Sequence, residues 1–273
     1  MTQAESYERF LALHQGPGAF VMPNVWDGLS ALIFKNAGFP ALATSSGALA
    51  AALGRQDGRH AVSAAEHLEH AKLLIDVSGL PVNGDFEDGY GETPADVGAT
   101  VLAAIDTGLA GIGVEDTSGD PDNPIRDFDD AVARVRAAAE VSRGRIVLTG
   151  RTDNFLHGRN DLDDTIRRLT AFAEVGADVL YAPYPPDLAA VEAIVKAVAP
   201  KPVNIVVRTK AEKPTVAQLS AAGVKRISTG SALYAHAAAA LQAAAAALNQ
   251  GDLTTATTGM PLREMFALIP DRA

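Results

Sequence analysis

Residues 81–91 of this 273-residue sequence consist of a short apolar run followed by an acid-rich segment. The apolar half reads as a buried strand, and Asp85 and Glu87 would point the same way because strand side chains alternate between faces. Gly89 and Gly91 allow the backbone to turn tightly behind these acids. Carboxylate oxygens suit Mg²⁺ or Mn²⁺, so the segment predicts a metal site. An acidic surface turn after a core strand is the alternative interpretation.

Short apolar or β-branched runs alternate with longer segments of helical period along the chain, which is typical of a parallel sheet built from βα units. Eight strands are predicted, at residues 19–23, 41–44, 81–85, 111–115, 146–151, 179–182, 202–206 and 225–228. Helices are expected at residues 28–36, 63–76, 94–107, 129–142, 162–175, 188–198, 215–221 and 231–248. Eight units in about 250 residues match a (β/α)₈ TIM-type barrel better than an open doubly wound sheet. We expect one barrel domain over residues 1–273, with 252–273 as a C-terminal helical extension.

The carboxyl ends of barrel strands carry the chemistry in this architecture, so the residues there are candidates for a site. Besides Asp85 and Glu87, these positions hold Asn24, Ser45, Ser46, Gly47, Glu115, Asp116, Arg151, Asp153, Tyr184, Asn204, Ser228, Thr229 and Gly230. Arg151 is the one strong cation in this set, which predicts bidentate pairing with a substrate carboxylate. A salt bridge to Asp153 or Glu115 is the alternative role for Arg151.

The turn from Thr44 through Ser45 and Ser46 to Gly47 offers hydroxyl and backbone N–H groups that could cradle an anion, although a helix-capping role is compatible with the same residues. Asp57 lies in a polar loop that either closes over the cation or is solvated surface. Five of the histidines, at positions 60, 67, 70, 157 and 236, show no metal-ligand pairing. We expect the two at 67 and 70 on the outer surface of a helix.

Composition excludes several classes of protein. The formal net charge of −10 and the pI near 5.0 leave no basic stripe for nucleic acid. The chain has no cysteine, which rules out disulfides, zinc–thiolate sites and thiol nucleophiles. Neither a signal peptide nor an apolar run of about 20 residues is present, so we expect no membrane partner and a cytoplasmic location.

Six segments taken in order resemble the isocitrate lyase and phosphoenolpyruvate mutase superfamily over nearly the whole chain. They are PNVWD at 23–27, TSSG at 44–47, DFEDGYG at 85–91, VED at 114–116, GRTD at 150–153 and PVN at 202–204. The resemblance implies a Mg²⁺-dependent barrel that binds or forms a 2-oxo acid through a metal-stabilised enolate. By that likeness Asp85 binds the metal directly, and the acids that hold its waters are Asp57, Glu87 and Glu115. The substrate would contact Ser46, Gly47, Arg151 and, nearer its distal end, Asn204.

The loop after the fourth strand departs from the family. Isocitrate and methylisocitrate lyases carry Lys-Lys-Cys-Gly-His there, whereas residues 116–126 contain no cysteine, lysine or histidine. The mutases carry lysine, asparagine and serine in this loop. Asn123 with Ser118 is the remaining support for that branch. We therefore expect carbon–carbon cleavage of a 2-oxo or 2-hydroxy dicarboxylate, as in oxaloacetate decarboxylases and dimethylmalate or methylisocitrate lyases, with water or Tyr184 as the proton donor. A phosphonate-processing enzyme and a non-catalytic oxo-acid binding protein are the alternatives.

A last apolar segment follows the eighth βα unit. Residues 254–269 place Leu262, Met265, Phe266 and Ile269 at helical spacing, which predicts one amphipathic helix that packs on a neighbour. Members of the family exchange their C-terminal helices between subunits. The resemblance therefore implies a homodimer, or a homotetramer built from such dimers, although the segment could instead fold back on its own barrel.

Overall fold

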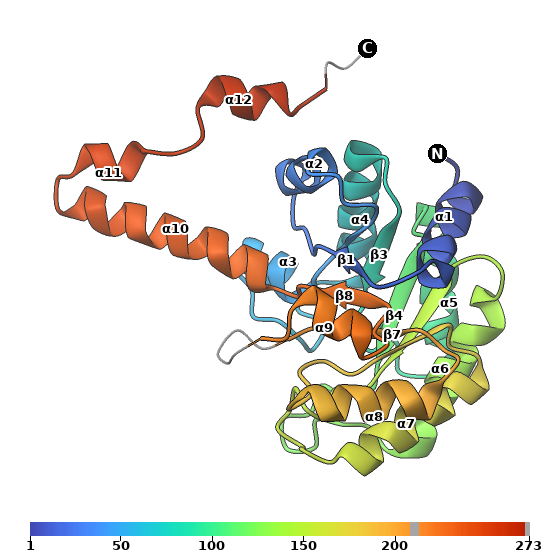
Figure 1. Cartoon of the computed structure of the whole chain (residues 1–273). Coiled ribbons are helices and arrows are strands. Elements are labelled where there is room, and N and C mark those ends of the chain that lie inside the picture. The colour runs from blue at the N-terminus through green and yellow to red at the C-terminus, as the bar shows by residue number, and fades with distance from the viewer. Residues whose placement is uncertain (208–212, 271–273) are drawn as a thin grey trace.

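The strands of the protein form one parallel sheet that curls into a barrel (Figure 1). The structure is a computed structural model, and it describes residues 1–207 and 213–270. Eight strands lie side by side in the order β1-β8-β7-β6-β5-β4-β3-β2. They are β1 (Phe20–Met22), β2 (Leu42–Ala43), β3 (Val82–Asp85), β4 (Gly111–Glu115), β5 (Val147–Arg151), β6 (Val179–Tyr181), β7 (Val203–Ile205) and β8 (Arg226–Ser228). The predicted barrel is confirmed, and each predicted strand lies within one residue of its observed ends.

Backbone contacts between the segment that follows β1 and the end of β2 close the barrel. The backbone N–H of Val25 donates to the carbonyl of Ala43 at 2.8 Å, and that of Ala43 donates to the carbonyl of Pro23 at 2.9 Å. Between the sheet and the surrounding helices lies the main apolar core, in which Ile112 and Leu148 of the strands are fully buried. This closed wall fixes the strand ends relative to one another.

Eight helices occupy the predicted places in the chain, and all of them except the last surround the sheet (Figure 1). They are α2 (Gly28–Asn36), α4 (Ala64–Ser78), α5 (Pro94–Thr107), α6 (Phe128–Ser142), α7 (Leu162–Val175), α8 (Leu188–Val198), α9 (Val216–Ala221) and α10 (Ala232–Asn249). Their starts follow the sequence signals. Thr93 caps α5 ahead of Pro94, and Ser63 forms a capping box with Glu66 at the start of α4.

Two further helices were not predicted. Helix α1 (Gln3–Gln15) covers the amino end of the barrel, where its Phe10 is fully buried against Ala110 and Val147. Helix α3 (Ser46–Ala52) starts directly after β2, and Ser45 caps it by accepting a hydrogen bond from the backbone N–H of Ala48 at 3.2 Å. The expected turn at 44–47 is therefore the start of a helix.

The C-terminal segment differs from the single amphipathic helix expected at 254–269. It forms two short helices, α11 (Leu253–Thr257) and α12 (Leu262–Ala267), separated by a stretch that contains Gly259 and Pro261. Proline lacks the N–H that a continuous helix needs, and glycine costs the most entropy when fixed, so the helix breaks here. In Figure 1, α10 extends away from the barrel and carries α11 and α12 with it. Within residues 1–207 and 213–270, no helix is long and apolar enough to cross a membrane.

Candidate active site

Carboxylates from neighbouring strands meet around the guanidinium of Arg151, the last residue of β5. Its Nη1 lies 3.1 Å from Asp85 Oδ1 and 2.9 Å from Glu115 Oε2. Its Nε and Nη2 donate to the two carboxylate oxygens of Asp153 at 2.6 and 2.9 Å. The salt bridges considered for Arg151 are therefore present. Asp153 also occupies the edge of the guanidinium that bidentate pairing with a substrate would use.

The site holds more buried negative charge than Arg151 balances. Burial raises the pKa of Glu115 well above its usual range, although Arg151 opposes that rise. Burial also raises the pKa of Asp57 and that of Glu87, and the charge of Asp85 raises the pKa of Asp57 further. A second cation among these acids would be stabilising, because it would relieve their mutual repulsion and favour their ionised forms.

The segment after β2 holds Asp85 in place. Ser46 donates to Asp85 Oδ2 from its backbone N at 3.0 Å and from its hydroxyl at 3.1 Å. Thr44 Oγ1 accepts a hydrogen bond from the backbone N–H of Asp85 at 2.7 Å. A methyl group at Gly47 would lie 2.8 Å from Ser231 Oγ and 2.9 Å from Asp57 Oδ2, so glycine permits this close approach. The predicted anion cradle thus also orients the central carboxylate.

Glu87 does not lie on the same strand face as Asp85. Strand β3 ends at Asp85, and Glu87 has a left-handed backbone with φ of 46°, so the expected alternation stops between them. Its carboxylate accepts hydrogen bonds from the hydroxyl of Tyr90 at 3.0 Å and from the backbone N–H of His60 at 3.2 Å. Asp57 nevertheless lies between the two acids' surroundings, because it lines one cavity with Asp85 and a second cavity with Glu87.

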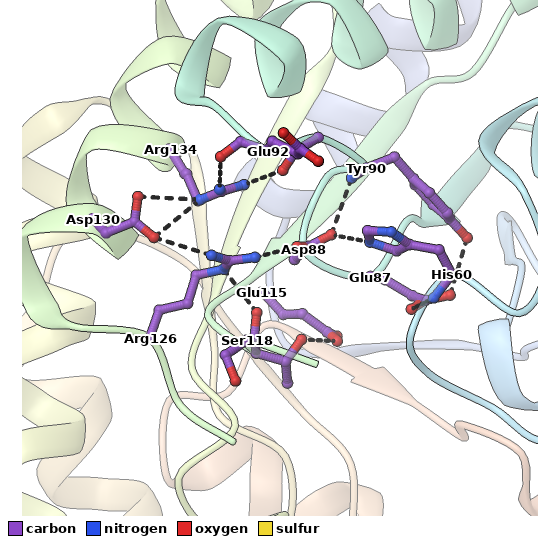
Figure 2. A network of polar contacts seen from close by, with 12 residues as sticks. His60, Glu87, Asp88, Tyr90, Glu92, Glu115, Ser118, Arg126, Asp130 and Arg134 are labelled. Carbon is purple, nitrogen blue, oxygen red and sulfur yellow. Dashed lines mark hydrogen bonds and ion pairs between the residues drawn. The ribbon is translucent and has the colours of Figure 1, made fainter. Parts of the chain in front are cut away.

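A polar network that the sequence reasoning missed ties the loops after β2, β3 and β4 together (Figure 2). Asp88 is its centre, with its carboxylate 2.7 Å from His60 Nε2 and 2.6 Å from Arg126 Nη2. Arg126 continues to Asp130, which also contacts Arg134. The hydrogen bond that His60 donates to Asp88, followed by charge contributions, raises the pKa of His60 even though burial opposes the rise. The loop at residues 54–63 is therefore tied to the loop after β3 through His60, although most of its residues are exposed.

Two cavities adjoin at the carboxyl ends of the strands. The inner one has a volume of about 140 Å³ and is lined by Asn24, Thr44 to Gly47, Asp85, Arg151, Tyr184, Asn204 and Arg226, among others. The outer one, of about 1140 Å³, lies between the loops and is bordered by Asp57, Glu87, Glu115 and Arg126. Leu49 and Phe155 line neither of these cavities, because both side chains are buried in apolar clusters.

The expected surface position of His67 is wrong. His67 is 1% exposed, because the face of α4 that carries it packs inward against the rings of Phe86 and Tyr90. Burial lowers the pKa of His67 to about 4 and lowers that of His70 as well. His70 lies on the same helix, and one of its ring nitrogens contacts the carbonyl of Trp26 at 2.9 Å. Both histidines therefore help to pack the helix layer.

The oxygen atoms around Asp85 fit a divalent ion that keeps most of its water. Within the described ranges, no three acidic or histidine side chains lie close enough to hold a metal ion together. Asp85 lines the inner cavity, whereas Glu87 and Glu115 border the outer one, and Asp57 borders both. One direct carboxylate with water-mediated contacts to others is a pattern that Mg²⁺ or Mn²⁺ accepts, whereas structural zinc takes four protein ligands.

A parallel eight-stranded barrel with acids and an arginine at its strand ends has the arrangement of a barrel enzyme. Residues 10–249 match the phosphoenolpyruvate phosphomutase family. The chain belongs to that family, and so to the superfamily of isocitrate lyase and phosphoenolpyruvate mutase that its motifs predicted.

Relatives from bacteria agree with this membership. An uncharacterized protein of Mycobacterium tuberculosis is 31% identical over 96% of each chain. The 2-methylisocitrate lyase of Bacillus subtilis is 28% identical and aligns over 66% of this chain and 60% of its own. The oxaloacetate decarboxylase of Bradyrhizobium diazoefficiens is 31% identical over 64% of this chain and 62% of its own.

Solved structures extend the comparison to the whole fold. A structure from Burkholderia cenocepacia J2315, described as that of a candidate lyase or mutase, is 40% identical with a TM-score of 0.92 and covers 97% of this chain and 95% of that one. An oxaloacetate acetylhydrolase in complex with its product oxalate is 26% identical with a TM-score of 0.86 and covers 98% and 95%.

Proposed function

We propose that this protein is a carbon–carbon lyase that uses Mg²⁺ or Mn²⁺ to act on a small 2-oxo or 2-hydroxy carboxylate. The candidates are oxaloacetate, which would be decarboxylated, and acids of the dimethylmalate or methylisocitrate type. The observation that carries the proposal is Asp85, which lines the inner cavity between the hydroxyl of Ser46 and the guanidinium of Arg151. The names of several relatives support the same class of reaction.

The acids have separate roles in this proposal. Asp85 is the direct metal ligand, and Asp57, Glu87 and Glu115 hold the water molecules of the ion. When bound, the ion supplies Lewis-acid stabilisation of the negative charge that develops as a bond next to a carbonyl group breaks. Arg151 holds Asp85, Glu115 and Asp153 in fixed positions, which limits the reorganisation that catalysis requires.

The substrate would lie in the inner cavity. The segment from Thr44 and Ser45 through Ser46 to Gly47 lines one side, and there the carboxylate would bind to hydroxyl and backbone N–H groups other than the two that Ser46 donates to Asp85. Arg151 contributes a single N–H rather than a bidentate pair, because Asp153 occupies its other edge. Asn204 of β7 contacts the distal end of the acid.

Tyr184 is the proposed proton donor to the enolate carbon. It follows β6, lines the inner cavity and has φ of 59°, a left-handed conformation that costs energy for a bulky residue. Its backbone N–H donates to the carbonyl of Val206 at 3.1 Å, which holds the strained turn. A strained backbone at a cavity wall is consistent with a side chain aimed for function rather than for stability.

The mutase branch receives little support from the loop after β4. Ser118 borders the outer cavity, but its hydroxyl donates to the carbonyl of Asn123 within the loop, and Asn123 is exposed and lies outside both cavity linings. The loop therefore satisfies its own polar groups. A binding protein without catalysis is the second alternative. It would bind the same acids as the proposed lyase, and only the absence of turnover would distinguish the two.

The test is a screen of purified, Mg²⁺-loaded protein with oxaloacetate, isocitrate, methylisocitrate, dimethylmalate and phosphonopyruvate. Cleavage of one carbon–carbon substrate, lost with EDTA, is the expected result. Turnover of phosphonopyruvate alone would identify the mutase branch, and oxalate binding without any turnover would identify a binding protein.

Arg151→Lys keeps the charge but loses the planar contact with three carboxylates, so the KM of this variant should rise. An unchanged KM would make Arg151 purely structural.

We also propose that a second copy of the chain covers the C-terminal segment, as a dimer or as a tetramer built from dimers. Helix α10 has no buried residue, and beyond it Leu262 is 67% exposed and Phe266 59% exposed. Burying each such side chain would contribute about 1.5–3 kcal/mol, which a second subunit with the same segment can supply reciprocally.

A further inference from the structure

Arg226 is a buried cation beneath the proposed substrate site. It is the first residue of β8 and is 1% exposed, yet it lines the inner cavity. Ser228, two residues later on the same strand face, also lines the cavity. Two residues along a strand correspond to about 7 Å, so Arg226 lies one layer deeper than the strand ends.

Three neutral acceptors hold its guanidinium. Nε donates to Asn204 Oδ1 and Nη2 donates to Thr149 Oγ1, both at 2.9 Å. Nη1 lies 3.3 Å from His14 Nε2. The other ring nitrogen, Nδ1, lies 2.8 Å from the carbonyl of Phe10, which can only accept, so Nδ1 carries the proton and Nε2 is the acceptor that faces Arg226. Burial, and then the charge of Arg226, lower the pKa of His14 to about 3, which keeps the imidazole neutral.

No carboxylate of the described chain forms an ion pair with Arg226, which sets it apart from the other buried arginines. Arg134 pairs with Asp130, and Arg168 pairs with Asp116 and Asp164. A buried charge without a counter-ion is costly, and burial accordingly lowers the pKa of Arg226 to about 9. At neutral pH the side chain is still charged, so its field acts on whatever enters the inner cavity.

We propose that Arg226 is the residue that selects a carboxylate for the inner cavity, because its uncompensated charge lies beneath the cavity and its Nε–H fixes Asn204. This inference rests on the proposed function and assigns the charge of the substrate group that the deep end of the site accepts. Arg151 is less suited to that role, because three acids within 3.1 Å already neutralise it. Arg226 acts as a positioning and selectivity residue and takes no part in bond breaking.

The orientation of Asn204 follows from the same contacts. Because its Oδ1 accepts from Arg226, its amide nitrogen points the other way and donates to Ser228 Oγ at 3.0 Å. A donor is therefore presented at the level of the strand ends, where an anionic group would lie. Asn83 Oδ1 also lines the cavity, is buried and has no hydrogen-bond donor among the described residues, so it can accept from a donor group of the occupant but does not itself attract a carboxylate.

The test compares oxalate with oxamate, in which an amide of the same size replaces one carboxylate. Titration calorimetry of the Mg²⁺-loaded wild type should show oxalate bound at least tenfold more tightly. Arg226→Met should reduce that preference to less than threefold, with the larger loss in oxalate affinity. Thr149→Val is the matched control, because it removes one hydrogen bond from Arg226 but leaves the charge, and it should keep the preference.

A second variant covers the case in which Arg226→Met does not fold. Asn204→Asp places a carboxylate against the guanidinium and neutralises it without emptying the core, so it should fold and should lose the preference for oxalate. A preference that survives in either folded variant, or is missing in the wild type, would overturn this inference and leave the proposed lyase activity standing. A wild type that binds neither anion would also overturn this inference, whereas the lyase activity would be decided separately by the substrate screen.

Discussion

Acid should destabilise this protein through a histidine at the amino end of the barrel. His14 is 4% exposed, and its pKa falls from 6.5 to about 3, first because of burial and then because of Arg226. Above its unfolded pKa of 6.5 the side chain is neutral in both states and does not affect the pH dependence. Below it, the unfolded chain binds a proton that the folded chain does not bind until the pH nears 3. The free energy of unfolding therefore falls as the pH falls through this window.

The free energy of unfolding falls by about 1.4 kcal/mol per pH unit below 6.5, or by roughly 2–3 kcal/mol at pH 4.5. His14→Gln removes the titrating group, while glutamine can still donate to the carbonyl of Phe10 and accept from Arg226. Urea unfolding at pH 7.5 and 4.5 should show that the variant loses less stability by roughly 2 kcal/mol. Other titrating groups, such as His67, affect both proteins alike. Equal losses in the two proteins would refute a neutral, buried His14.

Three further outcomes are expected. Asp85→Ala should abolish metal-dependent turnover and weaken oxalate binding at least tenfold, about 1.4 kcal/mol; calorimetry that shows unchanged binding in the variant, or in the wild type after EDTA, would contradict its role. Gly47→Ala should lower kcat/KM with little change in Tm, because the new methyl group displaces the flexible ends of Asp57 and Ser231 rather than backbone; equal kcat/KM would show that their positions do not matter. Truncation after Gly251 should make an assembly shrink or aggregate in light scattering, and a full-length protein that runs at 28.3 kDa would exclude the dimer.

The barrel was predictable from sequence because two different periods alternate eight times, and glycine or capping residues mark the borders. Helices α1 and α3 were not predicted, for different reasons. Helix α3 follows β2 without a loop, so the hydroxyls at 45 and 46 read as a turn. Helix α1 precedes the first strand, where the βα period gives no reason to expect a helix, although Thr2 and Glu5 form a capping box there.

The candidate site was predictable where it depends on strand ends and not where it depends on loops. The positions of Asp85, Glu115 and Arg151 follow from the strand pattern and the parallel register. The left-handed backbone at Glu87 is set by tertiary contacts that no local pattern encodes. The ion pairs of Asp88 likewise join residues far apart in sequence, and Arg226 could be recognised as a lone cation only when its neighbours were known to be neutral.

Helix α10 has a consequence for how the subunits would meet. It is rich in alanine, the residue with the highest helix propensity, and at 18 residues it exceeds the length of about 12–15 at which isolated helices become marginally stable. The helix is therefore formed before any partner arrives, as a rod about 27 Å long. Association through it would require little ordering of the backbone, so a smaller part of the free energy gained by apolar burial would be offset by conformational entropy. Encounter would be limited by orientation rather than by folding, and the dissociation rate would respond most strongly to substitutions along the rod.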